Sequence, residues 1–142
     1  YNSAWKNLGV NLAAGDINGD GQNEIVVGAG VGGGPHIRIF SGDGRLLSGG
    51  FFAYDKNFRG GVNLAVGDIN GDGIKEIITG PGVGGGPHLA IFNARGELLK
   101  QWLAYDSTSK SGIKVTASDL DGDKIDEIII LTTKVFTLSL LK

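Results

Sequence analysis

Apolar residues alternate with small or polar ones along three short stretches of the chain. Val62, Leu64 and Val66 share one face of an extended segment, and residues 10–15 and 113–117 show the same alternation. A period of two predicts β-strands. An acidic loop follows each of these strands at once. A β-branched run, predicted as the second strand, then follows each loop, over residues 24–27, 76–79 and 127–131.

These segments return at a fixed spacing. The sequence from Gly9 to Ala13 recurs from Gly61 to Ala65, an offset of 52 residues, and the next acidic loop follows after 51. Third strands are predicted over residues 36–40 and 88–92, and fourth strands end in residues 52–55 and 103–106. Four short antiparallel strands in a unit of about 50 residues are typical of a β-propeller blade.

The chain is therefore predicted to be all-β, with two full blades and a partial one in an incomplete ring. Residues 1–8 are expected to end a preceding blade or to form a closure strand. Residues 9–60 and 61–111 are the two full repeats, and residues 112–142 form a degenerate terminal blade with its last strand over 134–141. Because so few blades cannot close a ring, we expect a homo-oligomer or a longer propeller chain.

Composition supports a folded, helix-poor chain. The 142 residues include 26 glycines, which disfavour helix, and 41% hydrophobic residues, which is ordinary for a folded domain. No basic run could follow a phosphate backbone, so a nucleic-acid partner is not expected. No apolar run approaches the roughly 20 residues of a membrane helix, so membrane insertion is not expected either.

Most of the acidic residues lie in the three loops, residues 16–24, 68–76 and 119–127, where oxygen-bearing groups stand at positions 1, 3, 5 and 9. Glycines permit a tight turn, which would direct these oxygens toward one centre. Calcium takes 6 to 8 such oxygens, including backbone carbonyls. We expect one Ca²⁺ per loop, up to three in all. The predicted ligands, with position 7 offering its carbonyl, are Asp16, Asn18, Asp20, Gln22, Glu24, Asp68, Asn70, Asp72, Ile74, Glu76, Asp119, Asp121, Asp123, Ile125 and Glu127.

Other interpretations of the loops fit less well. An EF-hand needs a glutamate at position 12, which here is Val27, Thr79 or Ile130, and it needs flanking helices. Zinc prefers histidine or cysteine, and magnesium prefers small octahedral sites. Plain Asx turns remain the alternative without a metal. Lys124 replaces the turn glycine of the other two loops, so the third site is expected to be the weakest or most altered.

Several other features suggest chemistry but have simpler explanations. Residues 28–33 and 80–85 match G-x-G-x-x-G, yet Pro35 and a strand follow the first copy instead of the helix that a dinucleotide site needs. His36 and His88, the only histidines, are interpreted as structural. Aromatic residues at recurring places are expected to pack between blades: Phe40, Phe51, Phe52, Phe92, Trp102 and Phe136. Trp5 has no counterpart and is the aromatic residue most suited to a partner or to closure.

The motif Asp-x-Asn-x-Asp-Gly-x-x-Glu-Ile at residues 16–25 and 68–77, followed by Gly-x-Gly-x-Gly-Gly-Gly-Pro-His, resembles FG-GAP/VCBS repeats. These are the calcium-binding propeller blades of integrin α subunits and of many bacterial surface proteins. The resemblance implies a propeller with calcium in a hairpin loop of each blade, at an extracellular or cell-surface location.

We therefore expect a non-enzymatic adhesion or ligand-binding module whose partner is a protein or a glycan. The alternative is an accessory or carbohydrate-binding propeller of a secreted carbohydrate-active enzyme, because the family includes such domains.

Overall fold

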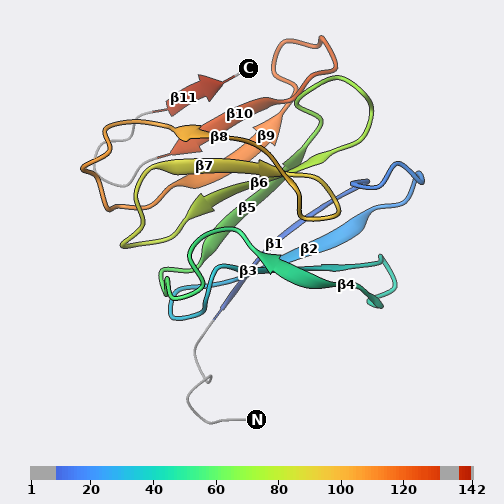
Figure 1. Ribbon diagram of the computed structural model, residues 1–142. Helices are drawn as coiled ribbons and strands as arrows, with labels where there is room; N and C mark the ends of the chain where they lie inside the picture. The colour runs from blue at the N-terminus through green and yellow to red at the C-terminus, as the bar shows by residue number, and fades with distance from the viewer. Residues whose placement is uncertain (1–8, 132–137, 142) are drawn as a thin grey trace.

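The computed structural model describes residues 9–131 and 138–141, and their strands form three antiparallel sheets (Figure 1). The first sheet contains β1 (Val10–Gly15), β2 (Glu24–Ala29), β3 (His36–Phe40) and β4 (Leu46–Phe52) in that order. The second contains β5 (Val62–Gly67), β6 (Glu76–Pro81), β7 (His88–Phe92) and β8 (Leu98–Leu103) in that order. The third has the order β11 (Leu138–Leu141), β10 (Glu127–Leu131), β9 (Lys114–Ser118).

The all-β prediction is confirmed, because the described residues form strands and turns and contain no helix. It follows that no helix in this part of the chain could span a membrane. The three sheets follow one another through the molecule without closing into a ring (Figure 1).

Strand positions agree with the sequence pattern, with shifts at some ends. β2 and β6 each continue two residues beyond the predicted second strand, to Ala29 and Pro81. β4 and β8 stop at Phe52 and Leu103, before the Ala-Tyr-Asp segments that were expected to end them. Of the strand predicted over 134–141, β11 covers Leu138–Leu141, and the remainder lies outside the described residues, as do residues 1–8 with Trp5.

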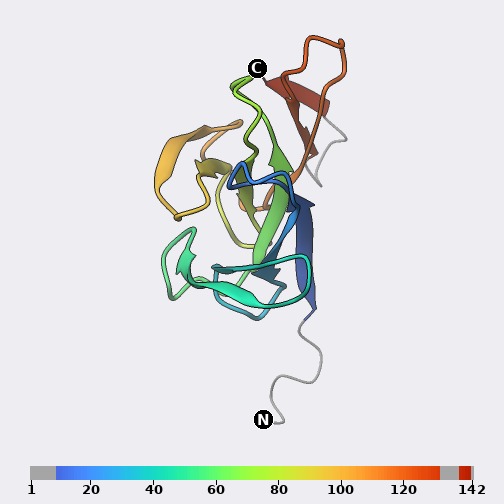
Figure 2. The same cartoon turned by 90° about the vertical axis from the view of Figure 1, so that its right-hand side faces the viewer.

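The two cores lie between neighbouring sheets, because alternate residues of β5 face opposite ways. Val62 and Leu64 join the first core, where they meet residues of the first sheet, including Val26. Ala65 joins the second core with residues of the third sheet, including Ile128. Every residue of β5 except Val66 is buried, since a sheet covers each face of the strand (Figure 2).

The first strands of the sheets lie next to one another. The side-chain amide of Asn11 donates to the carbonyl of Val62 at 2.6 Å, and that of Asn63 donates to the carbonyl of Ile113 at 2.6 Å. Each of these asparagines satisfies the backbone of the next sheet at the sheet edge, where ladder partners end. Because β1 contacts β5 and β5 contacts β9, these three first strands are called the inner strands below.

Some of the recurring aromatic side chains pack between neighbouring sheets, and others do not. The rings of Phe51 and Phe92 meet across the first two sheets with centroids 4.9 Å apart, as predicted. Phe52 differs, because its ring lies against His36 of its own sheet at 4.9 Å and it is 52% exposed. Phe136 lies outside the described residues.

A partly buried tyrosine also joins the first and second sheets. The hydroxyl oxygen of Tyr54 lies 2.9 Å from Oγ1 of Thr79 and 3.0 Å from the carbonyl oxygen of His88. Burial raises the pKa of Tyr54, and the hydrogen bond to Thr79 opposes that shift. The phenol therefore stays neutral and acts as a structural crosslink.

Candidate metal centre

The three acidic loops join the first and second strands of their sheets at corresponding places. In each hairpin the last residue of the first strand pairs with the glutamate of position 9, as Gly15 does with Glu24 and Gly67 with Glu76. Ser118 and Glu127 form the same pair in the third sheet. The loops project toward the upper right of Figure 1, so the sheets present them on one side of the molecule.

The aspartate at position 1 closes each loop through backbone hydrogen bonds. Asp16 Oδ1 accepts from the N–H of Gly19 at 2.6 Å, and Oδ2 accepts from that of Gly21 at 2.8 Å. Asp68 and Asp119 accept the equivalent bonds at 2.7–2.9 Å. Desolvation is the largest single contribution and raises the pKa of Asp16, but the backbone hydrogen bonds from Gly21 and its neighbours together outweigh it. The pKa is therefore lowered, which favours the carboxylate form.

Positions 3 and 5 extend the same curl. Asn18 Oδ1 accepts from the N–H of Asp20 at 2.8 Å, and Asp20 Oδ1 accepts from that of Gln22 at 2.8 Å. The other two loops repeat both bonds at 2.8–3.2 Å. These are successive Asx turns, in which a side-chain oxygen binds the backbone two residues on. These hydrogen bonds hold each loop in a tight curl.

The glutamate at position 9 is buried at the base of each loop. Glu24, Glu76 and Glu127 are 3%, 5% and 5% exposed. In each case Oε2 accepts from the N–H of position 2, at 2.8–3.1 Å. Glutamate is seldom buried unless it is paired or coordinates a metal, so each of these carboxylates needs partners, and the N–H of position 2 supplies one of them.

The pKa of Glu76 shows the effect of this burial. Desolvation raises its pKa, the backbone of Ile69 opposes the shift through a hydrogen bond, and the charges of Asp72 and Asp68 raise it further. Asn70 Nδ2 donates to the second oxygen, Oε1, at 2.9 Å. A cation among these three carboxylates would remove the repulsion that raises the pKa.

The third loop brings three acidic side chains together. One oxygen from each of Asp119, Asp121 and Glu127 lies within 4.8 Å of the others. The first two loops have asparagine at position 3, so an amide stands where the third loop has a carboxylate. Within the described part of the chain, the third loop is the one with this carboxylate cluster.

Lys124 takes the conformation of the glycines that it replaces. Its φ is +71°, against +84° for Gly21 and +85° for Gly73. Its N–H still donates to Asp119 Oδ2 at 2.9 Å. A side chain costs roughly 1–2 kcal/mol in this left-handed region, so the third loop keeps the shared geometry at the expense of strain. Whether this site is the weakest stays a prediction.

In the second and third loops, positions 7 and 8 contact the loop that precedes them in the chain. The sequence pattern did not predict these contacts between loops. The side chain of Ile74 lies over Gly19, where an added Cβ would meet it at 3.1 Å, and Ile125 lies over Gly71 in the same way. The N–H of Lys75 donates to the carbonyl of Asp16 at 2.9 Å. The isoleucine repeated at position 7 of the second and third loops was the available signal, whereas the loop pattern predicts only a carbonyl role for Ile74 and Ile125.

The N–H of Asp126 makes the equivalent bond to the carbonyl of Asp68 at 2.7 Å. The loops are therefore tied in a row, the first to the second and the second to the third.

The donor set matches a hard, oxygen-seeking divalent cation. Each loop supplies carboxylate and amide oxygens, and neither cysteine nor histidine is present in any of them. Curved loops with several oxygens suit Ca²⁺ better than Mg²⁺, because Ca²⁺ tolerates more ligands and less regular geometry. If bound, the ion would be held by the loop carboxylates, with the buried glutamate at the base.

The two histidines and the glycine segments lie outside these loops. Burial and the charge of Arg38 lower the pKa of His36, whose ring lies tilted against that of Phe52. His88 borders a surface hollow with Tyr54 and Phe58. The G-x-G-x-x-G segments lead from β2 into β3 and from β6 into β7, with no helix N-terminus in the described residues to hold a pyrophosphate.

Comparison with protein families agrees with the repeat. A family model described as FG-GAP-like repeat matches residues 16–79 and 68–130, and each match begins at the first aspartate of an acidic loop. The chain belongs to the FG-GAP-like repeat family. No curated protein and no solved structure matches it.

Proposed function

We propose that this FG-GAP-like chain binds calcium in its acidic loops and serves as a non-enzymatic adhesion or ligand-binding module. The observation that carries the metal proposal is the cluster of Asp119, Asp121 and Glu127, with oxygens within 4.8 Å and the glutamate buried at its base. Three carboxylates so close repel one another, and a divalent cation reverses that repulsion.

Calcium would act on stability through the linked row of loops. A ligand that binds only the folded state stabilises it by about 2.7 kcal/mol at one hundred times its dissociation constant. The Asx turns connect the loop aspartates to the loop backbone, so an ion that binds these carboxylates also restrains the backbone of the hairpin. Each bound ion would fix one hairpin and, through positions 7 and 8, the loop before it.

We further propose that the three sheets are β-propeller blades and that another repeat covers the open face of β1. Val10 and Leu12 are 59% and 62% exposed, whereas their equivalents Val62 and Leu64 are 0% and 9% exposed against the first sheet. The same side chains are thus core residues wherever a preceding sheet is present. Further repeats of a longer chain, or a second copy, would supply that sheet.

The setting that we propose is extracellular or at a cell surface. Extracellular calcium modules work with dissociation constants of about 10⁻⁴ to 10⁻³ M, and positions 3 to 5 of all three loops are exposed to solvent. Family membership is compatible with this role but does not identify the partner, which is a protein or a glycan.

The metal proposal is tested by calorimetric titration of the chelated protein with CaCl₂ and by melting with and without EGTA. We expect saturable binding of up to three ions and a lower melting temperature in EGTA. Asp68→Ala should remove one ion, because this carboxylate closes the second loop. The matched control is Asp43→Ala, at a hairpin turn outside the acidic loops, which should keep every ion.

Two results would contradict the proposal. One is a melting temperature that is unchanged by excess EGTA. The other is an undiminished ion count in Asp68→Ala.

A further inference from the structure

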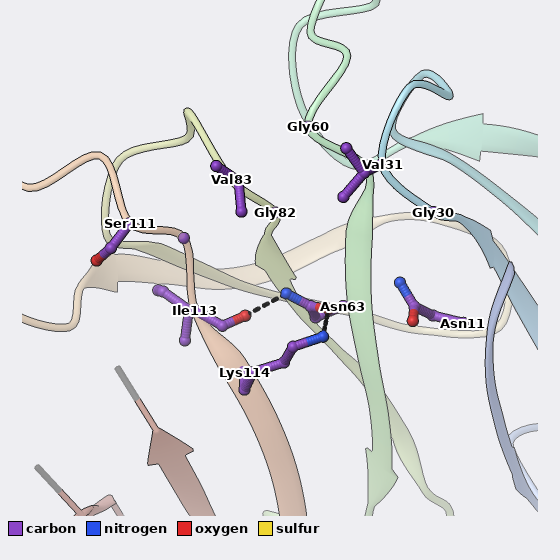
Figure 3. Close-up of a pocket in the computed structure, with 11 residues that line it drawn as sticks. Asn11, Gly30, Val31, Gly60, Asn63, Gly82, Val83, Ser111, Ile113 and Lys114 are labelled. Atoms are coloured by element: carbon purple, nitrogen blue, oxygen red, sulfur yellow. Dashed lines mark hydrogen bonds between the residues drawn. The ribbon is translucent and has the colours of Figure 1, made fainter. Parts of the chain in front are cut away.

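Three side chains stand at the same position of the three inner strands, at the end away from the acidic loops. Asn11 of β1, Asn63 of β5 and Lys114 of β9 all border one pocket (Figure 3). The pocket has a volume of about 130 Å³. The repeat thus supplies two amides and, in its third copy, one ammonium group.

Lys114 is held in place by the preceding repeat. Its Nζ donates to Asn63 Oδ1 at 2.9 Å, and the amide nitrogen of Asn63 donates to the carbonyl of Ile113 at 2.6 Å (Figure 3). The ammonium group has three donors, and this bond uses one of them. Asn63 is 8% exposed, so a buried amide orients the charge at the pocket.

Among the described residues, no acidic side chain forms an ion pair with Lys114. Lys114 is the one charged residue that lines the pocket. The ion pairs among the described residues are Lys75 with Asp126 and Arg95 with Glu97. The residues outside the described part contain no aspartate or glutamate. A lysine that is oriented by a buried amide and has no carboxylate partner can bind an anion from another molecule.

The rim of the pocket combines rigid backbone with two exposed apolar side chains. Val31 and Val83, at equivalent loop positions, are 64% and 65% exposed. Their loops are anchored by bonds from the N–H of Gly30 to Gly9 at 2.8 Å and from that of Gly82 to Gly61 at 2.9 Å. Anchored loops lose little entropy on binding, and exposed valines gain by being covered.

We propose that this pocket receives an acidic side chain, aspartate or glutamate, from a partner protein. Pockets for whole small molecules measure roughly 300–1,000 Å³, so about 130 Å³ suits one side chain better than a cofactor. The carboxylate binds the free donors of Lys114, and the flanking residues of the partner cover Val31 and Val83. The site is independent of calcium, because the acidic loops lie at the other ends of the same strands.

The test is an NMR titration of ¹⁵N-labelled protein in CaCl₂ with the capped amino acid N-acetylaspartate amide. Its uncharged match is N-acetylasparagine amide. We expect amide shifts at Val31, Val83 and Ile113 with the aspartate compound, and about tenfold weaker binding of the asparagine compound.

Lys114→Asn restores the residue of the other two repeats and should reduce the affinity for the aspartate compound about tenfold. Lys114→Arg should retain it. The matched control is Lys100→Gln on β8, whose Nζ lies over the ring of Trp102 and not in the pocket, and it should bind as the parent does.

Three outcomes would overturn the proposal. Equal binding of the two capped amino acids would show that the pocket does not recognise the carboxylate. Unchanged affinity in Lys114→Asn would place the anion elsewhere. Tighter binding of glucuronate than of the aspartate compound would assign the pocket to acidic sugars. None of these results bears on calcium, whose binding is measured separately by calorimetry.

Discussion

Nζ of Lys75 lies 3.2 Å from Oδ2 of Asp126, and the same oxygen accepts a hydrogen bond from the N–H of Asp68 at 2.8 Å. This pair joins the second acidic loop to the third. Lys75 also reaches back, since its own N–H donates to the carbonyl of Asp16 in the first loop. One residue of the second loop thus contacts both neighbouring loops.

Removing Asp126 should weaken both the fold and calcium binding at the second loop. In Asp126→Ala the N–H of Asp68 loses its acceptor and Lys75 loses its charge partner, so we expect a loss of about 1–2 kcal/mol in unfolding free energy. Asp126→Asn keeps an acceptor oxygen and should lose less. Urea denaturation in CaCl₂ measures both variants, and calorimetry measures the affinity.

The control for this pair is Glu97→Ala, which breaks the ion pair with Arg95, where the side chains are 57% and 78% exposed. Exposed pairs contribute about 0–1 kcal/mol, so little change is expected. Equal losses for Asp126→Ala and Glu97→Ala would show that the connection between loops has no special role.

Replacing Lys124 with glycine should stabilise the protein by about 1 kcal/mol. Its φ of +71° is unfavourable for a side chain, and glycine adopts this region without that penalty. Lys124→Ala is the matched control, because it removes the charge and keeps the strain. Thermal melts should therefore rank Lys124→Gly above both Lys124→Ala and the parent. A gain in the alanine variant equal to that in the glycine variant would attribute the effect to charge instead.

Glu76 should make the calcium-free protein less stable as pH rises. Its pKa is raised in the folded state, chiefly by burial and then by Asp72 and Asp68, so the folded protein holds this proton more strongly than the unfolded chain. This stabilising contribution is present below the unfolded pKa, near the ordinary value of 4.5, and is lost as pH rises through the folded pKa.

The variant Glu76→Gln tests this linkage, because its effect on the unfolding free energy should have opposite signs without and with calcium. Without calcium it removes a buried charge, so at pH 7 it should be more stable than the parent, and the difference should shrink toward pH 4.5. With calcium it should be less stable, because one ligand carboxylate is gone. Unfolding in EDTA and in CaCl₂ across this pH range measures both effects. A pH dependence in EDTA identical to that of the parent would contradict the assignment to Glu76.

The strands and the loop curl could be predicted because each is encoded locally and written more than once. Alternation predicted β1 and β5, and the Asp-x-Asn-x-Asp spacing predicted a tightly curled loop, which the structure forms through successive Asx turns. The links between loops were not predictable in the same way. Position 8 is Asn23, Lys75 or Asp126, so it shows no shared pattern, and its contacts depend on how one sheet packs on the next.

The third repeat also contains contacts between sheets that could not be predicted from the sequence. Lys124 and Lys114 both depart from the repeat, but the sequence could not distinguish the structural outcomes. Lys124 copies the glycine conformation, whereas Lys114 binds the asparagine of the preceding sheet and remains at a pocket. A departure from a repeat marks a position of interest, and only packing between sheets decides its effect.

Equivalent positions in the first two sheets allow the blade proposal to be tested within one chain. Val62 is 0% exposed in the core between these sheets, whereas Val10 is 59% exposed on the face that no described residue covers. In dilute monomer, Val62→Ala should lower the unfolding free energy by about 2 kcal/mol, through lost burial and a cavity. Val10→Ala should change it by less than about 0.5 kcal/mol.

At concentrations where the chain associates, substitutions on the exposed face of β1 should have a measurable effect on self-association. Sedimentation of Val10→Ala/Leu12→Ala should show weaker self-association than that of the parent, because the apolar face that another repeat would cover is reduced. Leu98→Ala is the control, since this residue is also exposed, at 48%, but lies on β8 at the far edge of the second sheet. If Val10→Ala alone destabilised the dilute monomer as much as Val62→Ala, the face of β1 would already be covered within one chain, and no further repeat would be needed there.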